Sequence, residues 1–388
     1  MFKISKDDAQ KIIHTMRSGT APYPYAESII CGREREIAEF RYQLNLLENG
    51  TGSFKFICGD YGIGKSLLLN AYKRIALQED YVVAAFQINN GFRLNKIEDL
   101  YYAIMHNLSI KGHVHTKASF EDIFDLWVEN LHNAPSVDLK RYEINAVCEA
   151  LTKFNANFAR AFLSYMRGRI QNNREMTAIS GAWLTGERNI PYELKAKYGF
   201  TGAVDKSNTL DFLKAFVRLI TLLEYKGLIV FIDELNLVLD DRSDIRQVSY
   251  NTLKHLIDLT TSGETPKVMF VLSGTDELLK NKEKGILSNT PLAQRLNYQS
   301  FESLNANSGH QNIMPIKTLN AEALLDLTKT ILHLYIQVHP KLATVDAHML
   351  YADIAGKLNK SEWATRHFVI KITEALDELA MFEQEGTQ

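Results

Sequence analysis

The sequence contains little that would mark a secreted or membrane-anchored protein. Its 388 residues include only three cysteines, Cys31, Cys58 and Cys148, which are widely spaced and form no C-x-x-C pair. This pattern argues against a disulfide framework and a structural zinc site, and it fits a reducing compartment. The opening residues, MFKISKDDAQ, lack the apolar segment of a signal peptide. We therefore expect a cytoplasmic protein.

Long apolar runs and an excess of one charge are also missing. The longest apolar stretch, residues 227–232, is far too short to cross a bilayer. The formal net charge of −2 argues against nucleic-acid binding over the whole surface but allows a local basic patch. A hydrophobic content of 46% indicates a chain that forms a packed core. At this length we expect one large domain with an appendage, or two domains.

Residues 53–77 combine a strand pattern, a glycine-rich loop and a helix pattern. The sequence is SFKFICGDYGIGKSLLLNAYKRIAL. The spacing G-x-x-x-x-G-K-S between a strand and a helix is that of a phosphate-binding P-loop. The residues expected around the phosphates are Gly59, Asp60, Tyr61, Gly62, Ile63, Gly64, Lys65, Ser66 and Leu67.

Each part of this loop has a chemical role in the prediction. Glycines allow backbone N–H groups to turn inward around phosphate oxygens. The helix that begins at Lys65 directs its N-terminal dipole at the same anion. We expect Lys65 to contact the β- and γ-phosphates of ATP and Ser66 to bind Mg²⁺.

A second segment, KGLIVFIDELNLVL at residues 226–239, completes the expected catalytic site. Its continuous apolar strand is typical of a parallel sheet that is covered on both faces. Two carboxylates, Asp233 and Glu234, follow at the carboxyl end, where such sheets bind ligands. We expect Asp233 to hold Mg²⁺ opposite Ser66, and Glu234 to act as the general base on the attacking water.

A further apolar strand, residues 267–272, ends in the hydroxyl residues Ser273 and Thr275. If this strand lies beside the previous one, either hydroxyl could reach the γ-phosphate or the attacking water. The sequence does not rank the two, and hydroxyl groups that only cap a strand end are the alternative.

Ile30, Gly32 and Arg33 precede the P-loop and are candidates for the adenine site. Apolar residues before a Gly-Arg-Glu turn could sandwich the base. An ordinary strand end followed by a helix start is the alternative.

Two arginines are candidates for contacts with the γ-phosphate. Arg295 ends a short helix before a last strand expected at residues 298–301, and could reach the nucleotide of a neighbouring subunit. Arg366 lies in the first turn of the last helix and could act from the lid. For both, a surface arginine is the alternative.

The expected fold class is α/β: a P-loop NTPase parallel sheet with a large helical insert and a C-terminal all-α lid. We assign residues 1–314 to the ATPase domain, with the mostly helical insert at about 95–225, and residues 315–388 to the lid. The expected lid occupies the last residues of the sequence, so no winged helix is expected after it.

Within the insert, four basic residues lie seven positions apart and predict one basic helical face. They are Lys153, Arg160, Arg167 and Arg174. This face either is solvated or contacts DNA phosphates or an acidic partner.

Taken together, these motifs resemble the AAA+ ATPases, especially the origin-recognition and transposition branch. More narrowly, the chain resembles the ATP-binding proteins of BREX-type bacterial phage-exclusion systems over almost its full length. The segments that carry the resemblance are IIHTMRSGTAP, CGREREI, GDYGIGKSLLL, WLTGE, YKGLIVFIDE, VLSGT, LAQRL and WATR. Three residues depart from the AAA+ pattern: Asp60 inside the P-loop, Asn236 after Asp-Glu-Leu, and Thr365 where a proline usually precedes the lid arginine.

The resemblance implies an Mg²⁺-ATP-dependent ATPase that works as a homo-oligomer and as a regulator or motor for other defence proteins, with DNA as a candidate partner. Two alternatives remain open at this stage. One is a transposition- or replication-type ATPase that loads a partner on DNA. The other is a nucleotide-gated signalling scaffold with little turnover.

Overall fold

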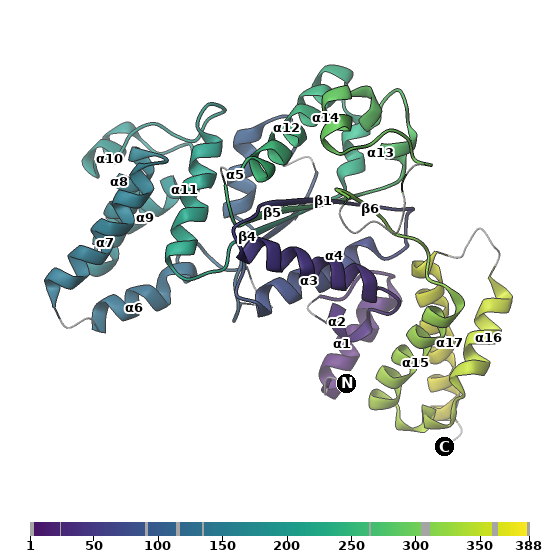
Figure 1. Cartoon of the computed structure of the whole chain (residues 1–388). Helices are drawn as coiled ribbons and strands as arrows, with labels where there is room; N and C mark the ends of the chain where they lie inside the picture. The colour runs from purple at the N-terminus through teal and green to yellow at the C-terminus, as the bar shows by residue number, and fades with distance from the viewer. Residues whose placement is uncertain are drawn as a thin grey trace.

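The computed structural model describes residues 4–23, 25–89, 92–113, 117–133, 136–263, 265–302, 304, 311–358 and 364–385. Within them, a six-stranded sheet has the order β3-β2-β4-β5-β1-β6 (Figure 1). The strands are β1 (Ser53–Cys58), β2 (Val82–Gln87), β3 (Leu108–Ser109), β4 (Leu228–Asp233), β5 (Val268–Gly274) and β6 (Ile313–Pro315). All neighbouring pairs are parallel except β2 with β3. The predicted fold class is confirmed.

The central strands are apolar on both faces because helices cover both sides of the sheet. In β4, Leu228, Val230 and Ile232 pack into one core cluster, whereas Ile229 and Phe231 pack into another. This alternation follows the two-residue period of a strand. A continuous apolar run therefore fits a sheet buried on both faces.

Helices cover both faces of the sheet (Figure 1). The first face carries α3 (Glu34–Glu48) and α4 (Lys65–Gln78), and the opposite face carries α5 (Ile97–Met105), α11 (Thr209–Leu222) and α12 (Ser243–Thr261). Phe40 of α3 stacks on Tyr72 of α4, with ring centroids 4.1 Å apart. Short helices α13 (Glu277–Lys280) and α14 (Thr290–Arg295) follow β5.

The insert contains α6 (Asp125–Asn133), α7 (Val137–Thr152), α8 (Ala156–Ile170), α9 (Arg174–Leu184) and α10 (Tyr192–Lys197). Its interior is aromatic. Phe162 is fully buried, and its ring lies 6.0 Å from that of Trp127 and 5.8 Å from that of Phe124. The short strand β3 is the one described strand in the range 95–225. It adds an antiparallel edge to the sheet.

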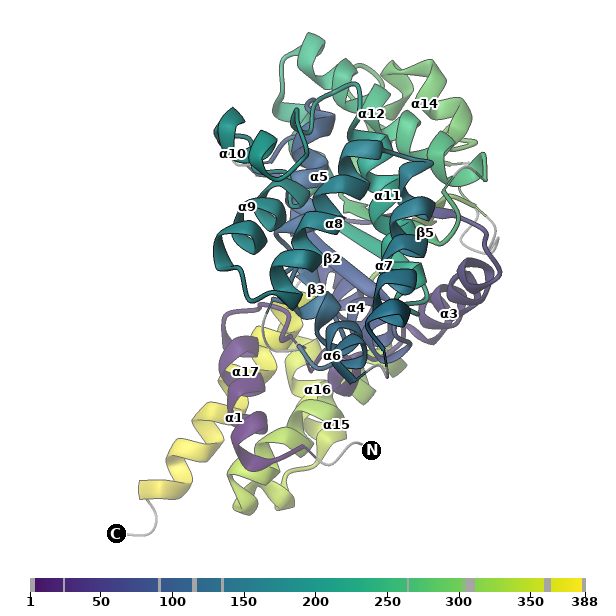
Figure 2. The ribbon, with the colours of Figure 1, turned by 90° about the vertical axis from the view of Figure 1, so that its left-hand side faces the viewer.

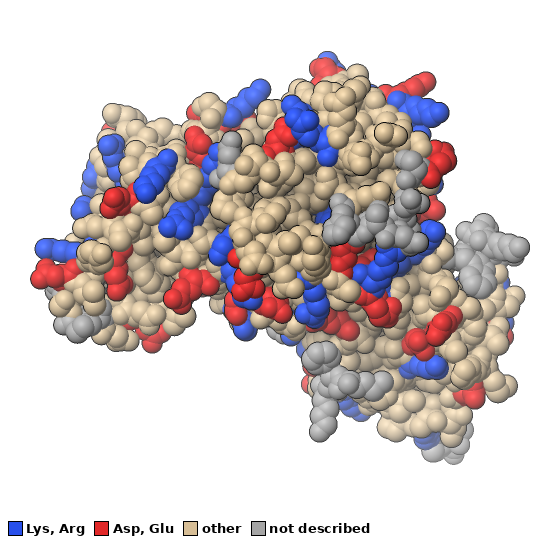
Figure 3. Space-filling view, viewed as in Figure 1, with Lys and Arg blue, Asp and Glu red and all other residues tan. Residues whose placement is uncertain are grey.

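The expectation of one continuous basic helical face is wrong. Lys153 is the C-cap of α7, Arg160 and Arg167 lie on α8, and Arg174 begins α9. The chain breaks twice because Asn155 and Asn173 cap new helices with their side chains. All four basic residues are exposed. On the face in Figure 3, Lys and Arg gather over the insert, and Asp and Glu lie mainly along its lower margin.

The C-terminal helices α15 (Ala321–Val338), α16 (Ala347–Lys357) and α17 (Thr365–Glu385) form a unit with its own core. The N-terminal helix α1 (Lys6–Arg17) belongs to this core through Ile12, Ile13 and Met16. Figure 2 shows α1 alongside α15 and α17. Arg17 also donates two hydrogen bonds to Asp377 of α17, at 2.8 and 2.7 Å. A boundary drawn at residue 314 therefore separates α1 from the helices on which it packs.

The last strand of the sheet was expected at residues 298–301, and this expectation is wrong. The strand is β6, and the earlier segment is a loop. Tyr298 is buried there, and its hydroxyl donates to the carbonyl of Leu279 in α13. The apolar residues of this segment therefore reflect packing against α13 and not a strand. In the described part of the chain, no helix is long and apolar enough to cross a membrane.

Candidate functional site

A cavity of about 400 Å³ lies at the carboxyl edge of the parallel sheet, between the sheet and the C-terminal helices. This volume falls in the range of small-molecule sites. The P-loop contributes residues 61–67, the strand ends contribute Gln87, Asp233, Glu234 and Thr275, and the C-terminal unit contributes Leu319, Leu327, Thr365, Arg366 and Val369. Segments far apart in the sequence meet here because parallel strands place their carboxyl ends at one edge.

The P-loop has the backbone that the glycine pattern predicts. Gly62 and Gly64 have φ angles of 77° and 99°, in the region that favours glycine. Lys65 begins α4, so the N-terminus of a 14-residue helix faces the cavity. Its Nζ donates to the carbonyls of Gly59 and Asp60, at 2.9 and 2.8 Å. Burial lowers the pKa of Lys65, while Asp233 and Glu234 oppose that shift.

Gly59 and Asp60 do not line the cavity. A side chain at Gly59 would collide with Ile63 and with the carbonyl of Ile316, so glycine is required there by packing. The Asp60 side chain is 76% exposed and lies 3.9 Å from Lys280 on α13. Its carboxylate is therefore directed toward a cation outside the loop. This geometry accounts for an acidic residue within a phosphate-binding sequence.

Asp233 is the centre of a hydrogen-bonded group. It accepts a hydrogen bond from Ser66 Oγ at 3.0 Å, one from the backbone N–H of Glu234 at 2.9 Å, and one from Ser273. These bonds fix the orientation of the carboxylate. The hydroxyl of Ser66 and the carboxylate of Asp233 are hard oxygen donors from facing elements, a set that suits Mg²⁺.

The two hydroxyls at the end of β5 lie in different environments. Ser273 is fully buried and donates to Asp233, so its hydroxyl does not face the cavity. Thr275 lines the cavity. The expectation that Ser273 contacts phosphate or water is therefore corrected, because its hydroxyl is buried and donates its hydrogen bond to Asp233. Thr275 remains as the candidate.

Glu234 lines the cavity in an unusual backbone conformation. Its φ angle is 61°, in the left-handed region that non-glycine residues rarely adopt. Asn236 donates to its carboxylate at 3.3 Å. An amide side chain two residues after the glutamate therefore helps to orient it, which gives a physical reason for Asn236 at this position.

The three residues expected around the adenine separate in the structure. Ile30 lines the cavity together with Ile29 and Cys31. Gly32 lines a neighbouring pocket, where a side chain would meet Ala323 of α15. Arg33 lies between the two pockets and is only 6% exposed. Burial lowers its pKa, and Glu36 opposes that shift.

The two candidate arginines also differ in position. Arg366 lines the cavity and donates to the carbonyl of Ser18 at 3.4 Å. Arg295 lies outside the cavity, and its side chain binds Asp258 of α12. Its carbonyl accepts from Asn312, the residue before β6. Arg295 therefore does not contribute to the cavity of its own chain.

One wall of the cavity was not predicted from the sequence. Residues 19–22, which connect α1 to the short helix α2 (Ala26–Ile29), line it together with Met16. Gly19 has a φ of 65°, and a side chain there would lie 2.8 Å from Arg366 Nε. The only local signal was a glycine after an amphipathic helix. It did not reveal that this helix packs on the lid. Gln87, at the end of β2, was also missed; its register partner is Asp233.

Comparison with known proteins places the chain in context. A family model described as "BREX system ATP-binding protein BrxC/D" matches residues 4–387, which confirms the resemblance found in the sequence. The comparison with curated proteins finds no match.

Three solved structures show remote likeness. The ORC2 protein of Aeropyrum pernix, in ADPNP and ADP complexes, is 14% identical, with a TM-score of 0.43 and coverage of 92% of this chain and 65% of that one. A Walker-type ATPase of Pyrococcus abyssi is 14% identical, with a TM-score of 0.37 and coverage of 92% and 73%. The ORC1 protein of Aeropyrum pernix, in complex with DNA, is 12% identical, with a TM-score of 0.33 and coverage of 93% and 64%. This chain thus spans about two thirds of the length of the ORC2 protein.

Proposed function

The chain belongs to the family of BREX system ATP-binding proteins BrxC/D, and from this premise we propose that it binds and hydrolyses Mg²⁺-ATP within a bacterial antiphage defence system. The observation that carries the proposal is the convergence of Lys65, Ser66, Asp233 and Glu234 on one cavity. Each of these residue types suits one requirement of phosphoryl transfer.

In the proposed reaction, Lys65 and the P-loop N–H groups bind the β- and γ-phosphates of ATP. Ser66 and Asp233 hold Mg²⁺, which supplies positive charge beside the phosphates when it is bound. Glu234 accepts a proton from the attacking water, and Asn236 keeps its carboxylate in place. Thr275 and Arg366, on the cavity wall, are the candidates for contact with the γ-phosphate.

The test is ATP turnover by the wild type and by Glu234→Gln. We expect the variant to bind ATP normally and to lose about 10²- to 10⁴-fold in turnover, because it lacks the general base. Glu224→Gln is a matched control: Glu224 is an exposed glutamate that also has a positive φ, of 70°. A wild type that binds ATP but shows no turnover, with or without DNA, would support the nucleotide-gated scaffold instead.

The proposal extends to an oligomer in which Arg295 completes the site of a neighbouring subunit. Its side chain lies outside the cavity of its own chain and binds Asp258 of α12, which suits a contact in trans rather than in cis. Arginines of this kind contribute about 10³- to 10⁵-fold to turnover in other P-loop enzymes. Native mass measurement with and without ATP tests whether nucleotide drives assembly.

We further propose that the protein regulates or drives other defence components in the cytoplasm. Its three cysteines are free thiols, which suits a reducing compartment. DNA is a candidate partner, because Arg160 and Arg167 are exposed two turns apart on α8. A DNA-associated ATPase that loads a partner protein remains the alternative, and the neighbouring genes would distinguish the two settings.

A further inference from the structure

Two successive carbonyl groups of the P-loop accept hydrogen bonds from donors outside the loop. The carbonyl of Gly62 accepts from the backbone N–H of Arg366 at 2.9 Å. The carbonyl of Ile63 accepts from Arg33 Nη2, also at 2.9 Å. The first donor belongs to α17 of the lid, and the second lies at the N-cap of α3.

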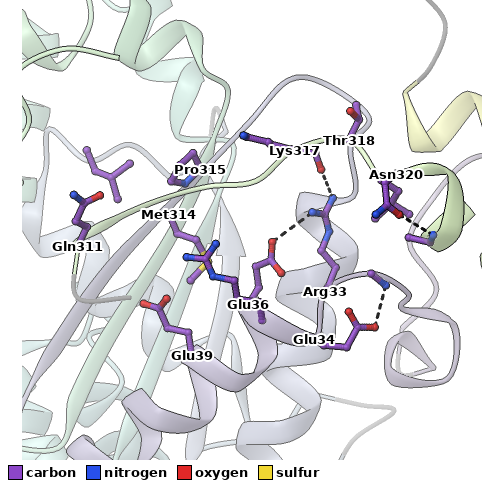
Figure 4. Close-up of a pocket in the computed structure, with 15 residues that line it drawn as sticks. Arg33, Glu34, Glu36, Glu39, Gln311, Met314, Pro315, Lys317, Thr318 and Asn320 are labelled. Atoms are coloured by element: carbon purple, nitrogen blue, oxygen red, sulfur yellow. Dashed lines mark hydrogen bonds and ion pairs between the residues drawn. The ribbon is translucent and has the colours of Figure 1, made fainter. Parts of the chain in front are cut away.

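Arg33 also binds the segment that leads into the lid. The same Nη2 donates to the carbonyl of Lys317 at 2.7 Å, and Nη1 lies 3.5 Å from the carboxylate of Glu36 (Figure 4). Lys317 lies between β6 and α15, in the connection from the sheet to the lid. Because the guanidinium is rigid and planar, one side chain holds both carbonyls in a fixed relation. A buried cation with these partners therefore joins the P-loop to the lid connection.

The direction of these bonds bears on phosphate binding. In a trans peptide unit, the C=O and the following N–H point in opposite directions. Fixing the carbonyls of Gly62 and Ile63 therefore turns the N–H groups of Ile63 and Gly64 away from the two donors. These N–H groups belong to the part of the loop that surrounds the phosphates in P-loop proteins.

Close packing supports the same connection. A side chain added at Gly62 would lie 3.2 Å from Cβ of Ala364 and 3.3 Å from Cβ of Arg366. The start of α17 therefore rests directly on the loop. A displacement of the lid would change both the backbone bond to Gly62 and the packing beside it.

We propose that Arg33 and the backbone N–H of Arg366 are positioning groups that couple the lid to the P-loop, so that the loop binds phosphate fully only when the lid is docked. Arg33 is thus a positioning residue rather than a direct ligand of the nucleotide. The inference rests on the proposed nucleotide-binding function. The part of the proposal that goes beyond nucleotide binding is the pair of hydrogen bonds that Arg33 donates, one to the carbonyl of Ile63 and one to the carbonyl of Lys317.

The first experiment compares Arg33→Gln and Arg33→Lys with Arg41→Gln in the full chain. Arg41 lies on the same helix, is 51% exposed and forms a surface ion pair with Glu79, so it controls for loss of an arginine from α3. We expect Arg33→Gln to weaken binding of a fluorescent ADP analogue about tenfold or more, because a buried charged hydrogen-bond donor is lost. Arg33→Lys, which keeps the charge but not the planar fork, should fall between the wild type and Arg33→Gln.

Amide hydrogen exchange without nucleotide provides an independent measurement. We expect exchange in Arg33→Gln to rise together at residues 61–66 and 316–320, and to stay at the wild-type level in Arg41→Gln. Binding within twofold of the control, or a rise confined to one of the two segments, would overturn the coupling. If the wild type binds no nucleotide, the proposed function fails, and the exchange experiment still decides whether the two segments are coupled.

A second pair of variants tests the lid side and does not depend on the folding of the Arg33 variants. Arg366→Ala keeps the backbone N–H, whereas Arg366→Pro removes it at a first-turn position where helices accept proline. We expect the proline variant to bind the ADP analogue more weakly than the alanine variant and to exchange faster at residues 62–64. Equal affinity and equal exchange would show that the bond to Gly62 does not position the loop.

Discussion

The carboxyl edge of the sheet and the helical insert use polar residues in different ways. At the sheet edge, polar groups from distant segments converge: Ser66, Ser273 and the backbone of Glu234 all donate to Asp233. In the insert, rings such as Phe158, Phe162 and Trp183 fill the interior, while basic residues such as Arg160 face solvent. The sheet edge is therefore arranged to bind a small charged ligand within one chain. The insert instead exposes basic side chains to solvent.

Under the proposed function, the sheet edge would bind the nucleotide and the insert would meet a partner. A binding site for ATP needs groups held in a fixed relation, and the sheet supplies this through its strand ends. A surface that meets DNA or another protein needs exposure and charge, and a helical insert supplies both. Variants in one region should therefore leave the function of the other unchanged.

The largest loss of ligand affinity is expected from Lys65→Ala. Removal of the charge beside the phosphates should weaken ATP binding by on the order of 10²-fold. Calorimetry measures the affinity, with Lys357→Ala, an exposed lid lysine, as the control. ATP should slow amide exchange at residues 59–67 in the wild type and leave residues 156–184 unchanged. Slower exchange throughout the insert would contradict the separation of the two regions.

The next effect concerns the aromatic interior of the insert. Phe162→Ala should destabilise the protein by about 3–5 kcal/mol, because a fully buried ring leaves a cavity. Urea unfolding measures the loss. Tyr142→Ala, which removes a ring that is 72% exposed on α7, should cost far less. ATP affinity should stay within about twofold of the wild type at low urea. A large loss of affinity would show that the insert shapes the nucleotide site.

A smaller effect is expected from charge reversal on the insert. The double variant Arg160→Glu and Arg167→Glu should weaken DNA binding and lower the slope of log affinity against log salt by about 2, since each phosphate contact contributes about 0.9. Its ATP turnover without DNA should remain at the wild-type level. Reversal of Lys329 and Lys371 on the lid makes the same change in net charge and serves as the control. An unchanged salt slope would remove DNA as a partner of this face.

The smallest effect concerns Lys73, a half-buried cation on α4. Burial, with a contribution from Lys117, lowers the pKa of Lys73 to about 8, although Nζ lies 4.3 Å from the ring of Tyr23. The unfolded chain therefore binds this proton more tightly than the folded chain, so its cost to stability is full below pH 8 and fades toward pH 10.5.

Lys73→Met should consequently be more stable than the wild type at pH 7, by about 1 kcal/mol after allowance for partial exposure and for the lost contact with Tyr23. The gain should shrink at pH 9.5. Urea unfolding at both pH values measures it. Equal differences at both pH values would show that the charge of Lys73 carries no cost.

Local patterns in the sequence predicted most of the fold. The apolar run before Asp233 and the glycine spacing at residues 59–64 each depend on neighbours in the chain, and such short-range relations can be read directly. The last strand was missed because the three residues of β6 carry little pattern of their own, whereas buried Tyr298 imitates a strand.

The roles of individual residues in the site, by contrast, could not be predicted from neighbouring residues in the sequence. Ser273 lies near the carboxyl end of β5 and Thr275 follows the strand, so the two are indistinguishable in the sequence, and only the register of β5 beside β4 placed Ser273 against Asp233. Arg33 was read as part of the adenine site because it precedes the P-loop. Its partners, Ile63 and Lys317, lie 30 and 284 positions away, so its joining role could not be read from neighbours.

The sequence by itself determined that this protein has a P-loop, a parallel sheet and acidic residues at a strand end, because these features follow from residue type and spacing over a few positions. The tertiary structure decided that α1 packs with the lid, that residues 19–22 close one wall of the cavity, and that Asp60 faces Lys280. These relations depend on contacts between segments tens to hundreds of residues apart. Burial of apolar surface brings such segments together, and it is largely indifferent to their order along the chain.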